Sequence, residues 1–301
     1  MTERDPLARR NGFDEYWRAA RLGAVVAIEK SNNPSEFLDF ERAGWGVSIA
    51  GYDDAFGVVS RQTVDPTLEA ARVHAGMRVL DICCGPGMLA EGAIARGARA
   101  VGLDFSDVVQ VARKLVPAAE FRQGDAQDLP FPDSSFDAVV CGYGLMHVPD
   151  AEKVLQEMFR VVRPGGRIAV SVWERTTPHN GFGLVYAAVR AHGNLNVPLP
   201  HGADFFQFGT EEKMHAALTA IGFSEVKTQF LPQDWHVQTG DEIMQAVLKG
   251  AVRSRALLAA QNETETRAIR GFFEQTLQGL PRAGAAYKVP LPAIIGSGAK
   301  P

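Results

Sequence analysis

Val79-Leu80-Asp81-Ile82-Cys83-Cys84-Gly85-Pro86-Gly87 is the stretch that decides the fold of this 301-residue chain. Its apolar first half predicts a parallel strand covered on both faces, and its glycines predict a tight turn that opens a helix. Asp81 then lies at the carboxyl end of the strand, where open α/β sheets bind ligands. Gly85 and Gly87 would let the backbone come close to such a ligand. Alone, the pattern also fits a plain strand-to-helix connection.

A second predicted strand, residues 98–103, ends at another acid, Asp104. In dinucleotide-binding folds, a carboxylate at about this distance along the chain from the first strand accepts hydrogen bonds from two ribose hydroxyls. A dinucleotide site requires Gly-x-Gly-x-x-Gly, so that a pyrophosphate lies on the helix N-terminus. The turn here lacks the third glycine at that spacing, and Pro86 removes an N–H group that a pyrophosphate would use. The pattern therefore disfavours a nicotinamide-dependent oxidoreductase.

Three further segments extend the series of strand ends and turns. Residues 121–131 carry a third acid, Asp125, and residues 136–141 form another apolar strand. The turn at residues 163–167, Arg-Pro-Gly-Gly-Arg, precedes a fifth strand over residues 168–172. Strands that alternate with helical segments predict a parallel sheet.

The ordered series of Asp81, Asp104 and Asp125 with the later strand and turn resembles the class I S-adenosylmethionine-dependent methyltransferases. Their small-molecule branch, which includes quinone and natural-product methyltransferases, is the most similar. The resemblance covers residues 76–173 strongly, and it implies an α/β fold: a Rossmann-like, doubly wound sheet of about seven strands with helical cap insertions. One position departs from the family pattern, because Cys83 stands where the family has its first glycine.

The resemblance implies a role for each residue at the methionine and ribose end of the cofactor. Gly85 and Gly87 would line the methionyl and ribose portion through backbone contacts. Asp81 would orient the amino group of the cofactor, and Asp104 would hold the ribose hydroxyls. Cys141, at the end of the fourth strand, would sit beneath the sulfonium. The competing interpretation of the acids is that each caps the next helix.

At the adenine end, the resemblance implies that Phe105 covers one face of the base. The carboxylate of Asp125 would accept a hydrogen bond from the adenine amino group, and the N–H of Ala126 would reach a ring nitrogen. Tyr52, within residues 51–56, resembles the aromatic lid that many relatives fold over the methionine end. Tyr52 as a mere packing residue is an equally good interpretation.

His147 is the best candidate for a catalytic base, since it follows the fourth strand directly in Gly-Tyr-Gly-Leu-Met-His. A histidine suits proton removal near neutral pH, and acceptor-side residues of the family lie here. A structural histidine at a helix start is the competing interpretation, and His179 and His201 are weaker candidates for the base. No acidic cluster follows the fourth strand, so we expect no metal.

Composition limits the substrate and the compartment. The net charge of −4 and the pI near 6.0 provide no basic field, which disfavours nucleic acid as substrate. No apolar run approaches the roughly 20 residues of a membrane span, and the N-terminus lacks a signal-peptide pattern. Three cysteines make a disulfide scaffold implausible, so we expect a cytoplasmic protein, with a homodimer as one option.

We expect an N-terminal helical arm or lid over residues 1–72 and a methyltransferase domain over residues 73–301. The arm contains a predicted helix at residues 13–22 and a second helix capped by Asp65, with Pro66 at its first position. Two cap insertions are expected at residues 174–208 and 241–279, the latter as two helical stretches. The second insertion would lie between a sixth strand (225–230) and a last strand (within 290–297).

These observations predict S-adenosylmethionine-dependent methyl transfer to a small, aromatic or partly apolar acceptor, with O-methylation favoured over C- or N-methylation. S-adenosylhomocysteine would be the product. The alternative is a non-catalytic adenosylmethionine-binding partner or regulatory protein. An intact aromatic cap with a nearby base would favour the enzyme, and a filled acceptor pocket would favour the binding protein.

Overall fold

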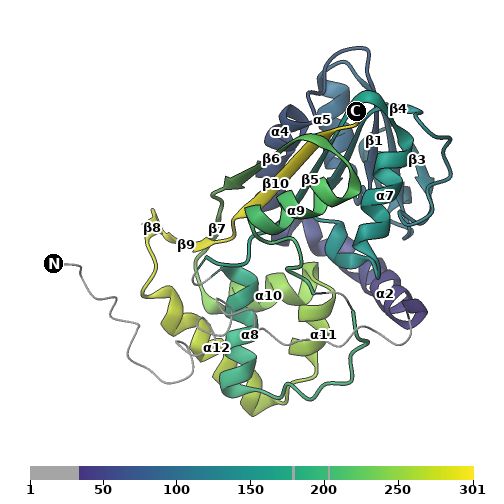
Figure 1. Ribbon diagram of the computed structural model, residues 1–301. Coiled ribbons are helices and arrows are strands. Elements are labelled where there is room, and N and C mark those ends of the chain that lie inside the picture. The colour runs from purple at the N-terminus through teal and green to yellow at the C-terminus, as the bar shows by residue number, and fades with distance from the viewer. Residues whose placement is uncertain (1–33, 178–179, 203) are drawn as a thin grey trace.

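The computed structural model describes residues 34–177, 180–202 and 204–301 (Figure 1). The helix expected at residues 13–22 and the weaker base candidate His179 lie outside these residues. Within the described part of the chain, no helix combines the length and apolar character needed to cross a membrane.

A seven-stranded sheet forms the core, in the order β3-β2-β1-β4-β5-β10-β6. The strands from β3 to β5 run parallel, whereas β10 runs antiparallel to both β5 and β6. This arrangement confirms the predicted α/β sheet of about seven strands. The strands are β1 (Arg78–Ile82), β2 (Arg99–Asp104), β3 (Glu120–Gln123), β4 (Phe136–Gly142), β5 (Val162–Trp173), β6 (Ser224–Leu231) and β10 (Ala293–Ala299).

Helices cover both faces of this sheet (Figure 1). Side chains alternate along a strand, so Val79 and Leu80 of β1 belong to two different core clusters, and both are fully buried. This two-sided burial explains why β1 is apolar apart from Arg78, at its start, and Asp81. One face packs against α4 (Val64–Ala70), α5 (Met88–Ala95) and α6 (Val109–Leu115), and the other against α7 (Ala151–Val161) and α9 (Glu211–Ile221).

The segment between β6 and β10 is a helical insertion closed by a small sheet. It contains three helices where two were expected, and strand β7 pairs antiparallel with β9, from Asp234↔Pro290 to Val237↔Tyr287. This ladder brings the two ends of the insertion together at the main sheet. The elements are β7 (Asp234–Val237), α10 (Gly240–Gly250), α11 (Arg253–Ala259), α12 (Glu263–Leu277), β8 (Arg282–Ala283) and β9 (Ala286–Pro290).

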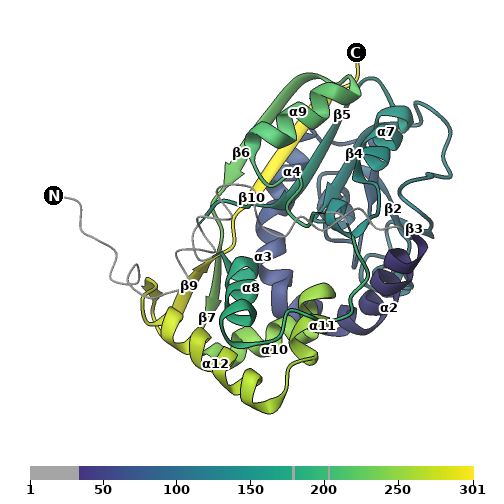
Figure 2. The same ribbon diagram turned by 60° about the horizontal axis from the view of Figure 1, so that its bottom comes forward.

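The other expected insertion, after β5, contains α8 (Gly181–His192), whose first turn is capped by the side chain of Asn180. Helix α8 packs against α11 and α12. Figure 2 shows α8, α10, α11 and α12 gathered at one end of the molecule, beside the end of the main sheet. The two insertions therefore form one helical cap.

A helical run, α2 (Pro34–Tyr52) and the turns that follow it, leads into α4 without a break. The prediction that Asp65 caps a new helix is wrong, because the preceding residues are already helical and the cap position falls on Thr63. Asp65 instead accepts a hydrogen bond from Arg96. The run tightens to a 3-10 turn at Arg61–Thr63, just before Pro66 removes a backbone donor.

Helix α2 is held against the helical cap. It packs along α10, and the hydroxyl of Ser48 donates a buried hydrogen bond of 2.8 Å to the carbonyl of Ala251. Small residues permit this close approach: a Cβ on Gly51 would lie 2.8 Å from Cβ of Lys249. The chain before the main sheet thus covers the same edge of the sheet as the later insertions do.

Candidate functional site

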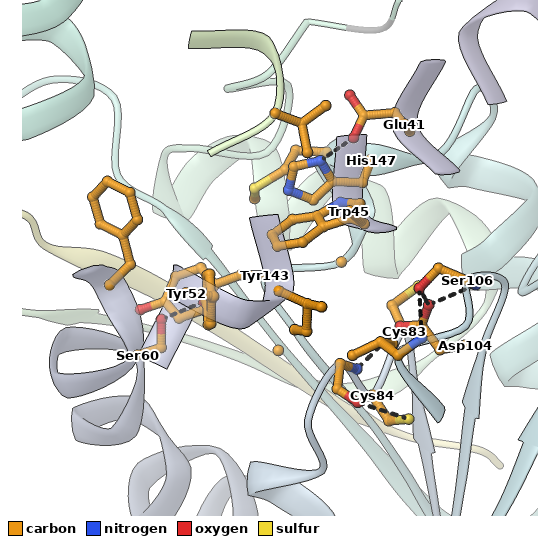
Figure 3. Close-up of a pocket in the computed structure, with 18 of the residues that line it drawn as sticks. Glu41, Trp45, Tyr52, Ser60, Cys83, Cys84, Asp104, Ser106, Tyr143 and His147 are labelled. Carbon is orange, nitrogen blue, oxygen red and sulfur yellow. Dashed lines mark hydrogen bonds and ion pairs between the residues drawn. The ribbon is translucent and has the colours of Figure 1, made fainter. Parts of the chain in front are cut away.

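A pocket of about 140 Å³ lies between the carboxyl ends of β1, β2 and β4 and the elements that cover them (Figure 3). A cavity needs about 10–15 Å³ on this measure to hold one water, so this pocket can hold a ligand of many heavy atoms. Its floor comes from the strand ends and the turn after β1. Its walls come from α2, α8, the loop before α9 and the junction of α10 with α11.

Asp81 lies at the floor of this pocket and is 1% exposed. Its Oδ2 accepts a hydrogen bond of 3.1 Å from the backbone N–H of Ala90 in α5. Burial raises the pKa of Asp81 to about 8, and the nearby carboxylate of Asp104 adds to the increase. Asp81 has no cationic partner among the residues that the structure describes, so its buried carboxyl group is suited to receive a ligand cation, which would favour the charged form.

The turn after β1 has three residues in the left-handed region: Cys83 (φ +52°), Gly85 (φ +51°) and Gly87 (φ +93°). A Cβ on Gly85 would meet no atom within 4 Å, and Gly85 lines the pocket. A Cβ on Gly87 would lie 2.9 Å from Cζ of Phe121. Gly85 therefore faces the ligand space, and Gly87 faces the packed interior beneath β3.

Cys83 adopts the backbone conformation that favours glycine, as expected for the position where the related family has one. Its side chain lines the pocket and hydrogen-bonds with Cys141, which is fully buried. Gly144 makes room for the pair, because a Cβ there would lie 2.4 Å from Cβ of Cys83. Cys141 thus lies behind Cys83 and is not among the described residues that line the pocket.

Asp104 ends β2 and is 6% exposed. Its Oδ2 accepts a 3.0 Å hydrogen bond from the N–H of Gly85, and its Oδ1 accepts from the N–H and the hydroxyl of Ser106. Burial raises the pKa of Asp104, although these hydrogen bonds and the nearby His147 counteract the increase. The carboxylate is therefore fixed in orientation, with lone pairs left for ligand hydroxyls at the pocket wall.

A narrow side pocket opens beside Asp104. Phe105, Asp125 and Ala126, the three residues expected at the adenine end, line it together. The guanidinium of Arg42, on α2, lies 5.7 Å from the centre of the Phe105 ring. Asp125 is held by its own turn, since its Oδ1 accepts a 2.8 Å hydrogen bond from the N–H of Gln127.

His147 lines both pockets and is paired with a residue that the sequence did not single out. Its Nδ1 lies 2.9 Å from Oε2 of Glu41, a carboxylate on α2 that is 2% exposed. The rings of Trp45 and Phe205 meet the imidazole edge-on, at 5.0 and 6.1 Å between centres. Figure 3 shows Glu41, His147 and Trp45 together at one side of the pocket.

The other side of the pocket is aromatic and hydroxyl-bearing. Tyr52, near the end of α2, lines the pocket, and its hydroxyl lies 2.7 Å from that of Ser60. Tyr143 stacks on Trp173 with 3.8 Å between ring centres. Phe56 and Phe182 also line this side of the pocket, and their rings stack with 5.2 Å between ring centres.

The structure thus places most of the predicted site residues around one pocket: Tyr52, Asp81, Gly85, Asp104, Phe105 and His147 line the main part, and Asp125 and Ala126 line its side pocket. His201 is exposed and is not among the described residues that line either pocket. Across the described ranges, no three His, Cys, Asp or Glu side chains converge as a metal site would require.

Comparison with known proteins agrees with this geometry. Residues 80–170 match a family model described as a methyltransferase domain. A demethylmenaquinone methyltransferase of Listeria welshimeri is 44% identical over 113 residues, which are 34% of this chain and 48% of the relative. One from Lysinibacillus sphaericus is 42% identical over 129 residues, 39% of this chain and 55% of the relative. The chain spans about half the length of the curated relatives that it matches.

Solved structures share the fold. The YcgJ protein from Bacillus subtilis has a TM-score of 0.51 at 23% identity, over 79% of this chain and 98% of that one. Phosphoethanolamine N-methyltransferase 2 of Haemonchus contortus, in complex with S-adenosyl-L-methionine, has a TM-score of 0.55 at 18% identity. The match covers 88% of this chain and 60% of that one. The [4+2]-cyclase SpnF has a TM-score of 0.52 at 16% identity, over 90% of this chain and 98% of that one. These similarities support the fold and leave the reaction to the site itself.

Proposed function

We propose that this chain, which carries a class I S-adenosylmethionine-dependent methyltransferase domain over residues 80–170, transfers a methyl group to a small acceptor in the pocket described above. The observation that carries the proposal is the convergence of two sets of residues on one pocket. The strand-end acids Asp81 and Asp104 lie at its floor, and a histidine–carboxylate pair and aromatic rings lie at its walls.

The residues present fit the cofactor. Gly85 leaves open space where any side chain would intrude, and its N–H fixes Asp104 for ribose hydroxyls. Asp81 is a buried acid that lacks a cationic partner among the described residues, and the amino group of the cofactor would supply one. Phe105, Asp125 and Ala126 line a narrow side pocket of about 10 Å³ beside Asp104, which would have to widen to take the adenine ring.

S-adenosylmethionine supplies a methyl group already activated by its sulfonium. The protein therefore has to align the acceptor atom with that methyl group and exclude water, and such alignment is worth about 7–11 kcal/mol of the barrier. Helix α2 and the helical cap cover the pocket, and Ser48 ties them together. Tyr52, whose hydroxyl lies 2.7 Å from that of Ser60, lines the same pocket and would act as a lid over the methionine end of the cofactor.

His147 is the proposed general base, and this assignment favours a hydroxyl acceptor. Glu41 accepts a hydrogen bond from Nδ1 of His147 when that nitrogen carries the proton, which leaves Nε2 free to accept the acceptor's proton. Glu41 is buried and would stabilise the imidazolium that forms. An amine acceptor already carries a lone pair once neutral, so the buried pair supports O-methylation over N-methylation.

The aromatic walls support a ring-containing, partly apolar acceptor. Trp45, Phe56, Trp173, Phe182 and Phe205 all line the pocket, and flat rings pack well in offset or edge-on arrangements against such walls. Two curated relatives are demethylmenaquinone methyltransferases, which is in keeping with a ring acceptor for this chain. The open pocket favours an enzyme over the alternative of a silent adenosylmethionine-binding protein.

Transfer of a labelled methyl group from S-adenosylmethionine to a panel of phenols, hydroquinones and aromatic amines tests the proposal. We expect labelled product from at least one phenol or hydroquinone, and loss of that product in the variant His147→Gln. Binding of the cofactor without transfer to any member of a broad extract-derived acceptor library would instead support the silent binding protein.

A further inference from the structure

One cation lines the acceptor side of the pocket, and no carboxylate among the described residues forms an ion pair with it. Arg253 begins α11, directly after the turn that joins α10 to α11, and its side chain is half-buried. Among the described residues that line the pocket, it is the one lysine or arginine. Its Nη1 donates a 2.6 Å hydrogen bond to the carbonyl of Pro200, in the loop that precedes α9.

Two buried arginines of this protein have acidic partners. Arg175 lies 2.8 Å from Asp204, and Arg167 lies 2.7 Å from Glu225. Of the residues that the structure describes, no Asp or Glu comes within 4 Å of Arg253. A guanidinium has five N–H donors, and the Pro200 carbonyl takes one of them. A ligand that fills the pocket would remove the remaining donors from water. They would then need acceptors, and among the described residues none is seen to accept from them, so the ligand itself would have to supply the acceptors.

The neighbours of Arg253 do not neutralise it. The buried Tyr186, whose hydroxyl hydrogen-bonds with Ser254, feels the charge of Arg253: burial raises the pKa of this tyrosine, and Arg253 counteracts the increase. Glu41 acts on Tyr186 from farther away, but its Oε2 is engaged by His147. The remaining acids of the pocket, Asp81 and Asp104, belong to the cofactor end.

We propose that Arg253 binds a carboxylate group of the acceptor, so that the substrate is an aromatic carboxylic acid with a hydroxyl group to be methylated. The planar guanidinium matches a carboxylate through two parallel N–H···O bonds, and the aromatic walls accommodate the ring. This inference rests on the proposed function, because it names the acceptor of the same pocket. It also orients the ring, since its charged end lies at the α10–α11 junction.

The test uses binding to the purified full chain saturated with S-adenosylhomocysteine, measured by calorimetry. The probes are benzoate, 4-hydroxybenzoate, 3,4-dihydroxybenzoate and 4-hydroxycinnamate, each paired with its amide, and phenyl phosphate. We expect at least one acid to bind wild type roughly tenfold or more tightly than its amide. Arg253→Gln is expected to remove that preference, and Arg253→Lys to retain part of it.

The matched control is Arg267→Gln, which changes an exposed arginine of α12 and should keep the preference for the acid. Unchanged affinity of Arg253→Gln for S-adenosylhomocysteine and for the amides would show that the variant is folded. The inference is overturned if no acid binds wild type more tightly than its amide, or if Arg253→Gln keeps the preference. Tighter binding of phenyl phosphate than of every acid would also contradict the carboxylate assignment.

The proposed function and the role of Arg253 would be contradicted by different results. Absence of S-adenosylhomocysteine binding to wild type would contradict the proposed function and, with it, this inference. Normal cofactor binding without a preference for acids would contradict the role of Arg253 alone.

Discussion

The carboxylate of Glu41 lies 2.9 Å from Nδ1 of His147, across 106 residues of sequence and between α2 and the turn after β4 (Figure 3). Glu41 is 2% exposed and the imidazole is 18% exposed, so the pair lies at the inner surface of the pocket. Trp45 supports the ring edge-on. The geometry is that of a base held in one orientation by a carboxylate.

Glu41→Gln should lower kcat about 10- to 100-fold, because the amide cannot stabilise the imidazolium that forms on His147. The affinity for S-adenosylhomocysteine should change by no more than about threefold, since the substitution keeps the size and polarity of the side chain. Steady-state kinetics with the acceptor found by the labelling experiment, together with calorimetry, measures both quantities.

The matched control for that variant is Glu36→Gln, an exposed position in the first turn of the same helix, which should leave kcat unchanged. If Glu41→Gln weakened cofactor binding and left kcat intact, the pair would be a latch that holds α2 over the cofactor, and the assignment of His147 as base would be refuted.

Cofactor binding should release a proton from Asp81. Burial raises the pKa of Asp81 to about 8, so the unliganded protein holds this carboxyl group mostly protonated at pH 7. An incoming ammonium group favours the ionised form. The affinity for S-adenosylhomocysteine should therefore rise as the pH increases toward 8, by up to about tenfold per pH unit. Calorimetry in buffers of different ionisation enthalpy counts the released protons, and proton uptake on binding would be the opposite result.

The same carboxyl group should make the unliganded protein less stable at higher pH. Its folded-state pKa of about 8 lies above the ordinary value of 3.8, so the folded state binds more protons than the unfolded state between these values. Stability thus falls as the pH rises through this window. Asp81→Asn should show a shallower decline in urea denaturation between pH 5 and pH 8, whereas an equally steep decline would place the titrating group elsewhere.

Gly85 and Gly87 should respond differently to alanine, although both have positive φ. In Gly85→Ala the methyl group meets no protein atom within 4 Å, so the fold should lose only about 1 kcal/mol while cofactor affinity falls at least tenfold. In Gly87→Ala the methyl group collides with Phe121, which should cost a further 1–3 kcal/mol. Denaturant unfolding and calorimetry separate the two effects; equal losses of stability would count against the orientation of this turn.

The parts of the site that the sequence predicted are local to strand ends. Asp81, Asp104 and Asp125 each follow a strand, and the carboxyl ends of parallel strands meet at one edge of the sheet, so their convergence follows from the fold. His147 lies in the turn after β4, at the same edge. These positions require only the order of strands along the chain.

The parts that the sequence missed depend on long-range packing. Glu41 reaches His147 because α2 crosses the pocket, and Arg253 lines it because the insertion folds back; neither belongs to a local motif. The strands β7 and β9 are short, and they pair with each other from opposite ends of the insertion. Asp65 has the local signature of a helix cap, but the helical residues before it decide the structure.

The measurement that tests the central claim most directly is calorimetric binding of S-adenosylhomocysteine to wild type, to Asp104→Asn and to Asp107→Asn, with NADH as the control ligand. Asp104 ends β2 inside the pocket, whereas Asp107 is exposed three residues later. The account predicts binding by wild type and by Asp107→Asn, weakened at least about tenfold in Asp104→Asn, and no binding of NADH. Binding of NADH, or failure of wild type to bind S-adenosylhomocysteine, would contradict it.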